Sequence, residues 1–171
     1  MLSPRPSTLD RAAFVAAYGG VYEHSPWVAE AVYDAGIGTG DDAAPALAGR
    51  MAQVVDAADG DAKLALLRAH PELAGRLAVA GNLTADSTAE QASAGLDRCT
   101  PEEFAEFHAL NARYTARFGF PFIVAVRGLT RQDILEAFRS RAGNGRETEF
   151  ATALRQVHRI ARLRLEAMQG T

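Results

Sequence analysis

The chain has 171 residues and lacks the features that mark secreted and membrane proteins. It contains one cysteine, Cys99, which cannot form an internal disulfide and therefore favours a reducing compartment. No apolar run approaches the roughly 18 residues that cross a membrane, and the first residues lack the apolar segment of a secretory signal. The last residues, Met168 to Thr171, do not form a peroxisomal address. These absences predict a cytoplasmic protein without a membrane partner.

Signatures of metal and nucleotide-cofactor sites are also missing. There is no His-Glu-x-x-His or Glu-x-x-His pair, and one cysteine cannot build a zinc site. Neither Gly19-Gly20 nor Gly143-Asn144-Gly145 fits a phosphate-binding loop. The formal net charge of −3 gives no general attraction to nucleic acid. The sequence therefore predicts no metal, no cofactor and no nucleic-acid partner.

The sequence does contain helical periodicity along most of its length. At 48% apolar and 23% charged residues it has the composition of a globular protein with one sizeable core. We expect one domain over residues 1–171 with an all-α fold, a single compact bundle of about seven to eight helices with one short extended segment near residues 120–126. The expected helices begin at Ser7 or Thr8, at Ser25-Pro26, near Pro45, near Ala62, at Thr84 or Ser87, at Thr100-Pro101, at Thr130 and near Arg146.

Helix boundaries are most clearly marked in the second half of the chain. Thr100-Pro101-Glu102-Glu103 combines an N-cap, a first-turn proline and the glutamate of a capping box. Thr130 and Asp133 repeat the pattern of cap and acidic third residue, and Gly119 is expected to end the helix between them. Two segments are expected to be irregular: 36–42, the least structured part of the chain, and 72–83.

Residues 120–126, Phe-Pro-Phe-Ile-Val-Ala-Val, form a short apolar run rich in strand-forming residues. The sequence has no second run of this kind to pair with it, so we expect an extended segment held between helices. Its backbone N–H and C=O groups lack the partners that a sheet provides, and buried groups of this kind must find others. A polar ligand is one such partner, which makes the segment a candidate binding site.

Arg164 falls within an apolar seam of the last expected helix. The seam consists of Phe150, Leu154, Val157, Ala161 and Met168. A guanidinium that points inward must be paired or must bind an anion, because an isolated buried charge is very costly. The alternative is an arginine near the helix end whose head group reaches water. By contrast, three arginines recur on the opposite side and are expected to face solvent: Arg155, Arg159 and Arg162.

A histidine and a carboxylate–amide pair are the other candidate site residues. Because Pro71 disfavours helical backbone in its predecessor, His70 is expected just after a helix end. Glu90 and Gln91 are expected in the first turn of the next helix, where free N–H groups favour anions. Each has a structural alternative, His70 as a helix cap or core residue and Ser87-x-x-Glu90 as a capping box. The remaining histidines have no such neighbours and are assigned no role: His24, His108 and His158.

Several of these motifs occur together, in order, in one protein family. They are His-Pro-Glu-Leu-Ala-Gly at 70–75, Ser-x-x-Glu-Gln at 87–91, Phe-Gly-Phe-Pro-Phe at 118–122, Arg-Leu at 164–165 and the stretch from Val21 to Glu30. With them the chain resembles the 2-oxo-4-hydroxy-4-carboxy-5-ureidoimidazoline (OHCU) decarboxylases of urate breakdown. The resemblance extends over nearly the whole chain.

The resemblance implies a cofactor-independent decarboxylation of a small ureidoimidazoline to (S)-allantoin and carbon dioxide, in a homodimer. It implies His70 as general acid, Glu90 as the group that orients it or binds substrate N–H groups, and Arg164 as a catalytic guanidinium beside developing negative charge. The substrate-binding residues that it implies are Pro71, Ser87, Thr88, Ala89, Glu90, Gln91, Phe122, Ile123, Val124, Ala125 and Val126.

Two other interpretations stay open from the residues themselves. One is a non-catalytic helical module whose grooves bind partner helices, with Arg164 in a structural ion pair. The other is a helical acid–base enzyme that acts on another ureide or a purine-derived ring. Substitution of His70 or Glu90 separates the first from an enzyme, and an assay with OHCU separates the second.

Overall fold

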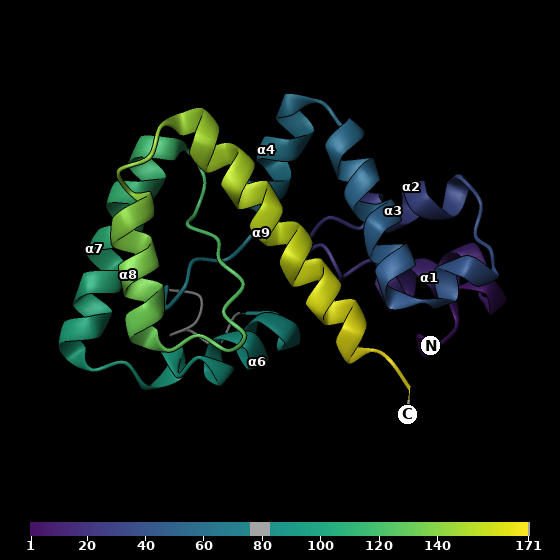
Figure 1. Ribbon diagram of the computed structural model, residues 1–171, viewed down its shortest axis with the longest axis horizontal. Helices are drawn as coiled ribbons and strands as arrows, with labels where there is room; N and C mark the ends of the chain where they lie inside the picture. The colour runs from purple at the N-terminus through teal and green to yellow at the C-terminus, as the bar shows by residue number, and fades with distance from the viewer. Residues whose placement is uncertain (76–82, 171) are drawn as a thin grey trace. The chain divides into compact units, whose positions relative to one another are not determined.

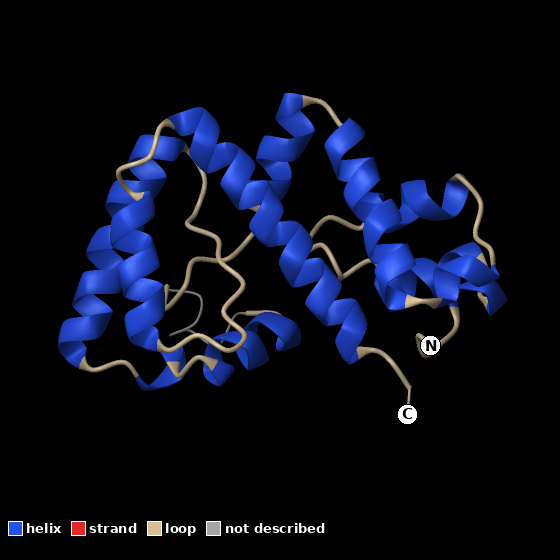
Figure 2. Ribbon diagram, viewed as in Figure 1, coloured by secondary structure: helices blue, strands red, loops and turns tan. Residues whose placement is uncertain are grey.

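The computed structural model describes residues 1–75 and 83–170, and helices dominate these ranges. The described part of the chain contains eight α-helices and three short 3-10 helices (Figures 1 and 2). The α-helices are α1 (Arg11–Tyr18), α2 (Trp27–Asp34), α3 (Ala44–Ala57), α4 (Gly60–Arg68), α6 (Ala85–Ser93), α7 (Pro101–Phe118), α8 (Arg131–Arg141) and α9 (Arg146–Ala167). The 3-10 helices are η1 (Pro6–Thr8), η2 (Thr39–Asp42) and η3 (Leu96–Arg98). The predicted all-α class is confirmed, and no helix in the described ranges has the length and apolar character needed to span a bilayer.

The second half of the chain begins and ends its helices where the sequence predicted. Thr100 and Glu103 form a capping box at the start of α7, and Thr130 and Asp133 form another at α8. Gly119 ends α7 in the left-handed conformation, with φ of 81°, which glycine adopts without steric cost. The residues of these caps are close neighbours in sequence, so local chemistry alone sets these boundaries.

The first two helices begin at residues other than the expected ones. Asp10, not Ser7 or Thr8, caps α1 by accepting a hydrogen bond from the Ala13 N–H at 2.8 Å. An aspartate carboxylate is a stronger acceptor for the first free N–H groups of a helix than a hydroxyl. Pro26, not Ser25, directly precedes α2, and the Ser25 hydroxyl donates to the backbone of its own loop instead.

The segment 36–42, expected to be the least structured, is instead fixed by two buried aspartates in η2. Asp41 pairs with Arg50 at 2.7 Å. Asp42 accepts hydrogen bonds from the N–H and the hydroxyl of Ser7 at 2.9 and 2.8 Å, which hold the pKa of that carboxyl below its usual value. Polar contacts to Ser7 and Arg50 therefore order the segment that the sequence predicted to be the least structured.

The chain divides into two compact units, residues 1–69 with 157–171 and residues 70–156, so the division falls within α9. In the first unit, α1, α2 and α3 pack together. Leu2 also forms an isolated antiparallel bridge with Gln169 there. The second unit contains α6, α7 and α8, and α7 lies beside α8 (Figure 1). The single domain over 1–171 stays a prediction, and the part of the expected irregular segment at 76–82 lies outside the described residues.

The core of the second unit is an aromatic cluster between α7, α8 and the segment that follows α7. Its rings belong to Phe107, Tyr114, Phe118, Phe120, Phe122, Phe138 and Phe150. Phe122 and Phe138 stack with centroids 3.9 Å apart, and the Tyr114 ring meets each of them edge-on. This packing fixes the start of the segment 120–126, which forms neither a helix nor a strand.

Candidate active site

His70 lies where the sequence predicted, after the end of a helix. The last residue of α4 is Arg68, with Ala69 as its C-cap, and His70 and Pro71 follow, both half-buried. The proline accounts for the break in the helix. The imidazole therefore begins an irregular segment rather than completing a helical turn.

Two buried amide side chains hold the backbone just after His70. Gln91 accepts from the Ala74 N–H at 3.0 Å and donates to the Glu72 carbonyl at 3.2 Å. Asn111 of α7 donates to the carbonyl of Leu73 at 2.9 Å. Ala74 has φ of 49°, which is unfavourable for a residue with a side chain and persists only where its surroundings impose it. Three consecutive residues are thus fixed by hydrogen bonds from two helices.

The helix that carries the Ser-x-x-Glu-Gln motif begins earlier than one of the two predicted starts. Thr84 caps α6 by accepting from the Ser87 N–H at 3.3 Å, so Ser87 lies inside the helix and is not its cap. Glu90 and Gln91 consequently lie in the second turn, not the first, and the predicted anion-favouring position at the helix N-terminus is wrong. The capping-box explanation of Glu90 is wrong for the same reason.

Burial separates the five predicted substrate-binding residues of α6 into two groups. Ser87 and Gln91 are buried and Glu90 is half-buried, whereas Thr88 and Ala89 are exposed. Residues at spacings of three and four share one helix face, so Ser87, Glu90 and Gln91 point to the same side. The Thr88 hydroxyl donates to the Thr84 carbonyl at 2.9 Å. Three of the five predicted residues, Ser87, Glu90 and Gln91, therefore lie on a common face of α6.

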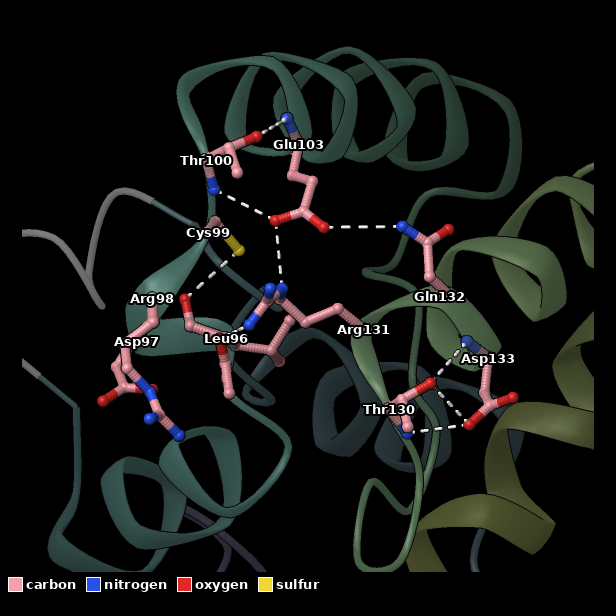
Figure 3. Close-up of polar contacts among 11 residues, drawn as sticks. Leu96, Asp97, Arg98, Cys99, Thr100, Glu103, Thr130, Arg131, Gln132 and Asp133 are labelled. Atoms are coloured by element: carbon pink, nitrogen blue, oxygen red, sulfur yellow. Dashed lines mark hydrogen bonds and ion pairs between the residues drawn. The ribbon is translucent and has the colours of Figure 1, made fainter.

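The end of α6 is tied to the starts of α7 and α8 through Arg131 (Figure 3). Arg131 donates to the carbonyl of Gly95 at 3.1 Å, and its Nε lies 3.0 Å from Glu103. The same carboxylate accepts from the Thr100 N–H, which lowers the pKa of Glu103 together with Arg131. Cys99 lies in this junction and donates to the carbonyl of Leu96 at 3.4 Å, while burial raises the pKa of its thiol. The thiol is therefore a structural donor here.

Side chains of two helices satisfy part of the extended segment. Arg141 donates to the Ile123 carbonyl at 2.7 Å, and the Ala125 N–H donates to Gln156 at 3.0 Å. The prediction that these backbone groups need partners is confirmed, although side chains supply these two. Phe122, Ile123, Ala125 and Val126 are buried, and Val124 between them is half-buried.

Arg164 is buried, as its place in the apolar seam predicted, with 5% of its surface exposed. Its Nη2 donates to the Glu23 carboxylate at 3.0 Å, and Nη1 lies 3.4 and 3.5 Å from the carbonyls of Gly20 and Val21. The alternative of a head group that reaches water is therefore wrong. Arg164 belongs to one unit, and His70 and Glu90 belong to the other. Their convergence on one substrate stays a prediction.

Four residues with direct contacts to the predicted site were missed from the sequence: Glu23, Asn111, Arg141 and Gln156. The sequence signals Asn111, because this residue interrupts the aromatic face of α7, and Glu23, because it lies within the stretch from Val21 to Glu30. Arg141 and Gln156 carry no such signal, since each is a polar residue in a helix rich in polar residues. Their partners in the segment, Ile123 and Ala125, are 18 and 31 residues away in sequence.

His158, which was assigned no role, joins two other side chains of its unit. The Tyr22 hydroxyl lies 2.7 Å from His158 Nδ1, and His158 Nε2 lies 3.2 Å from Asp56. Burial, and then Asp56, raise the pKa of Tyr22, so the hydroxyl keeps its proton. In the described ranges no three or more His, Cys, Asp or Glu side chains are grouped to hold a metal ion.

Comparison with known proteins identifies a family for this chain. The family model described as OHCU decarboxylase matches residues 7–166. The 2-oxo-4-hydroxy-4-carboxy-5-ureidoimidazoline decarboxylase of Haloferax volcanii is 43% identical over 157 residues, which cover 92% of this chain and 89% of that protein. The protein of the same description from Mus musculus is 34% identical over 164 residues, covering 96% of this chain and 90% of that one.

Solved structures agree with the sequence comparison. A crystal structure of (S)-allantoin synthase superposes with a TM-score of 0.73 at 35% identity, over 94% of this chain and 51% of that chain. The present chain therefore spans about half the length of that protein. A crystal structure of OHCU decarboxylase in the presence of (S)-allantoin has the same fold, with a TM-score of 0.65 at 18% identity over 83% of this chain and 89% of that one. The chain belongs to the OHCU decarboxylase family.

Proposed function

We propose that this chain is a carboxy-lyase that converts OHCU to (S)-allantoin and carbon dioxide in urate degradation. The observation that carries the proposal is the family match over residues 7–166, which contains His70, Glu90 and Arg164 within the predicted motifs. We further propose that residues 1–171 act as one domain, in a cytoplasmic homodimer whose small-molecule partner is the ureidoimidazoline.

The reaction requires an acceptor for the electron pair that decarboxylation leaves behind, and a proton donor on one face of the ring. When the bond from the ring carbon to the carboxylate breaks, the pair passes into the conjugated C=N of the substrate ring. A proton must then reach one face of the ring to give a single enantiomer. His70 is the proposed general acid, because an imidazole exchanges protons near neutral pH. The fixed backbone from Glu72 to Ala74 supports this role by holding the segment that follows the imidazole.

Glu90 and Ser87 are proposed to bind the ureido and ring N–H groups and to orient His70. Their common face on α6 supports a shared ligand. Gln91 has both ends of its amide on the backbone of residues 72 and 74, so its proposed contribution is to shape the site beside the substrate. The extended segment is proposed to supply backbone hydrogen bonds through Val124.

Arg164 is proposed to stabilise oxygen that gains charge as carbon dioxide leaves. A guanidinium that gripped the departing carboxylate tightly would stabilise the ground state and would not accelerate the reaction. Arg164 already shares its charge with Glu23. The ion pair therefore weakens the attraction of Arg164 for the substrate carboxylate in the ground state, while its positive charge still favours oxygen that becomes negative in the transition state.

The non-catalytic interpretation also predicted an ion pair for Arg164. A measurement of activity therefore has to distinguish the decarboxylase from a non-catalytic module. OHCU is generated in situ from urate with urate oxidase and hydroxyisourate hydrolase, and allantoin is followed by circular dichroism. We expect faster decay of OHCU and an (S)-allantoin signal with this protein. Unchanged decay and racemic product would exclude the decarboxylase.

Two variants test the proposed catalytic residues in the same assay. His70→Asn and Glu90→Ala are each expected to lower kcat at least about 100-fold, the size of a lost acid–base contribution. His108→Asn is the matched control, because His108 is an exposed histidine of α7. Full activity in His70→Asn would contradict the assignment of the general acid.

A further inference from the structure

Arg141, on α8, contacts the extended segment at two adjacent residues. Its Nη1 donates to the Ile123 carbonyl at 2.7 Å, and its guanidinium carbon lies 4.4 Å from the centroid of the Phe122 ring. Phe122 also stacks on Phe138, one turn earlier on α8. A guanidinium suits both contacts, because it donates in fixed directions and packs flat on an aromatic face. Arg141 therefore fixes the backbone and the side chain of the segment together.

A buried carboxylate holds Arg141 in that position. Glu149 has no exposed surface, and its Oε1 accepts from Arg141 Nε at 2.6 Å and from the Tyr114 hydroxyl at 2.7 Å. Its Oε2 accepts from Asn144 at 2.8 Å. Burial, aided by the bond to Glu149, raises the pKa of Tyr114, so this donor keeps its proton. Tyr114 and Asn144 thus hold the Glu149 carboxylate in place, and the carboxylate in turn holds Arg141 in a single position.

Gln156 fixes the other side of the same short stretch. Its Oε1 accepts from the Ala125 N–H at 3.0 Å. Val124 lies between the two anchored residues, and its N–H and C=O groups make no hydrogen bond to any residue in the described ranges. It is also half-buried, whereas Ile123 and Ala125 are buried. The two anchors therefore orient the backbone on either side of Val124, whose own N–H and C=O groups a ligand can use.

We propose that Arg141, held by Glu149, is a positioning residue that sets the backbone of Val124 for substrate binding. This inference rests on the proposed function, which assigns residues 122–126 to the substrate. Arg141 acts through the segment and does not touch the substrate itself. Since the backbone groups of Val124 bind the substrate before and during the reaction, their displacement changes KM more than kcat.

A second ion pair of α8 provides the contrast. Arg139 pairs with Glu106 at 2.7 Å, two residues before Arg141, but both side chains are substantially exposed and neither contacts the extended segment. A pair of this kind contributes little to stability. Arg139→Met thus removes an arginine and an ion pair from the same helix without disturbing Val124, and it is the matched control.

The decisive variant is Arg141→Lys. Lysine keeps a positive charge for Glu149, but its single ammonium cannot reproduce the two-directional donation to Glu149 and Ile123. KM for OHCU is expected to rise on the order of tenfold with kcat changed less than about threefold. Arg141→Met and Glu149→Gln are expected to raise KM at least as much, and Arg139→Met is expected to match the wild type.

Amide hydrogen exchange by NMR provides a readout independent of activity. The Ala125 amide, which is hydrogen-bonded in the native protein, is expected to exchange at least about tenfold faster in Arg141→Lys while amides of α3 keep their rates. Wild-type values of both KM and Ala125 exchange in Arg141→Lys would overturn this inference alone. A wild-type protein without decarboxylase activity would overturn the proposed function and this inference with it.

Discussion

Arg164 and Glu23 form an ion pair in which both side chains are almost completely buried, with exposed fractions of 5% and 2%. Burial removes water from both charges, so the pair depends on mutual attraction and on hydrogen bonds to the remaining N–H groups. Gly20 and Val21 provide backbone oxygens for those groups. Loss of one charge leaves the other without compensation, which costs far more than loss of an exposed pair.

Glu23→Gln is therefore expected to lower the free energy of unfolding by about 3 kcal/mol, measured by urea denaturation at pH 7. Arg11→Met is the control, because Arg11 pairs with Asp34 at the exposed surface and is expected to change stability little. Equal free energies of unfolding for the two variants would show that the buried pair contributes no more to stability than the exposed pair does.

Asn111 allows stability and activity to be separated. Its Nδ2 satisfies the Leu73 carbonyl, but its own Oδ1 is buried without a hydrogen-bond partner in the described ranges. Asn111→Leu removes a donor that the segment needs and also an acceptor that is costly to bury, so the two effects oppose one another. We expect the free energy of unfolding to change by less than about 1 kcal/mol.

The same variant is expected to lower kcat/KM for OHCU on the order of tenfold, because the segment after His70 loses one of its anchors. Thr115→Ala, an exposed change on the same helix, is the control for both measurements. Unchanged kcat/KM in Asn111→Leu would show that Gln91 alone suffices to hold residues 72–74.

At the scale of helices, the sequence predicted the boundaries that are set by residues close together in sequence. It missed the boundaries at which several residues could each serve as the cap. The caps of α7 and α8 join residues three apart in sequence. Thr84 and Ser87 both satisfied the pattern at the start of α6, and only the structure shows that Thr84 caps the helix. Asp10 displaced the expected caps of α1 because several polar residues precede that helix.

Gly95 links α6 to η3, and its conformation leads to a further prediction. It has φ of 73°, and an added Cβ would lie 2.9 Å from Nη1 of Arg131. Gly95→Ala combines backbone strain with displacement of Arg131 from its bond to the Gly95 carbonyl. We expect a loss of about 1–2 kcal/mol in the free energy of unfolding.

Two other glycines separate these contributions. Gly128 has φ of 82° with open space around it, so Gly128→Ala measures strain alone. Gly20 has neither strain nor a near neighbour, so Gly20→Ala is the neutral control. Among the three variants, Gly95→Ala should have the lowest midpoint temperature of thermal unfolding, and Gly128→Ala the next lowest. Equal values for these two would mean that Arg131 moves away without cost.

At the scale of the whole chain, distance along the sequence limits what could be predicted. Arg164 and Glu23 are 141 residues apart, and Tyr22 and His158 are 136 apart. Periodicity placed Arg164 on a buried face but carried no information about its partner. The family resemblance predicted which residues matter, and the structure then added the contacts within each unit that hold them.

The dependence of stability on pH also belongs to the whole molecule. The pKa values of Asp42, Glu103 and Asp133 are lowered by hydrogen bonds to backbone N–H groups, so each carboxylate is favoured by the folded state. Their contribution to the free energy of unfolding is complete above the ordinary pKa values of 3.8 for aspartate and 4.5 for glutamate. It is lost as the pH falls through the lower pKa values that these groups have in the folded protein. Urea denaturation from pH 7 to 3 should therefore give a nearly constant free energy of unfolding above about pH 5 and a decline below it. Asp133→Asn should flatten the decline. A free energy that rises as the pH falls below 4 would contradict the assignment.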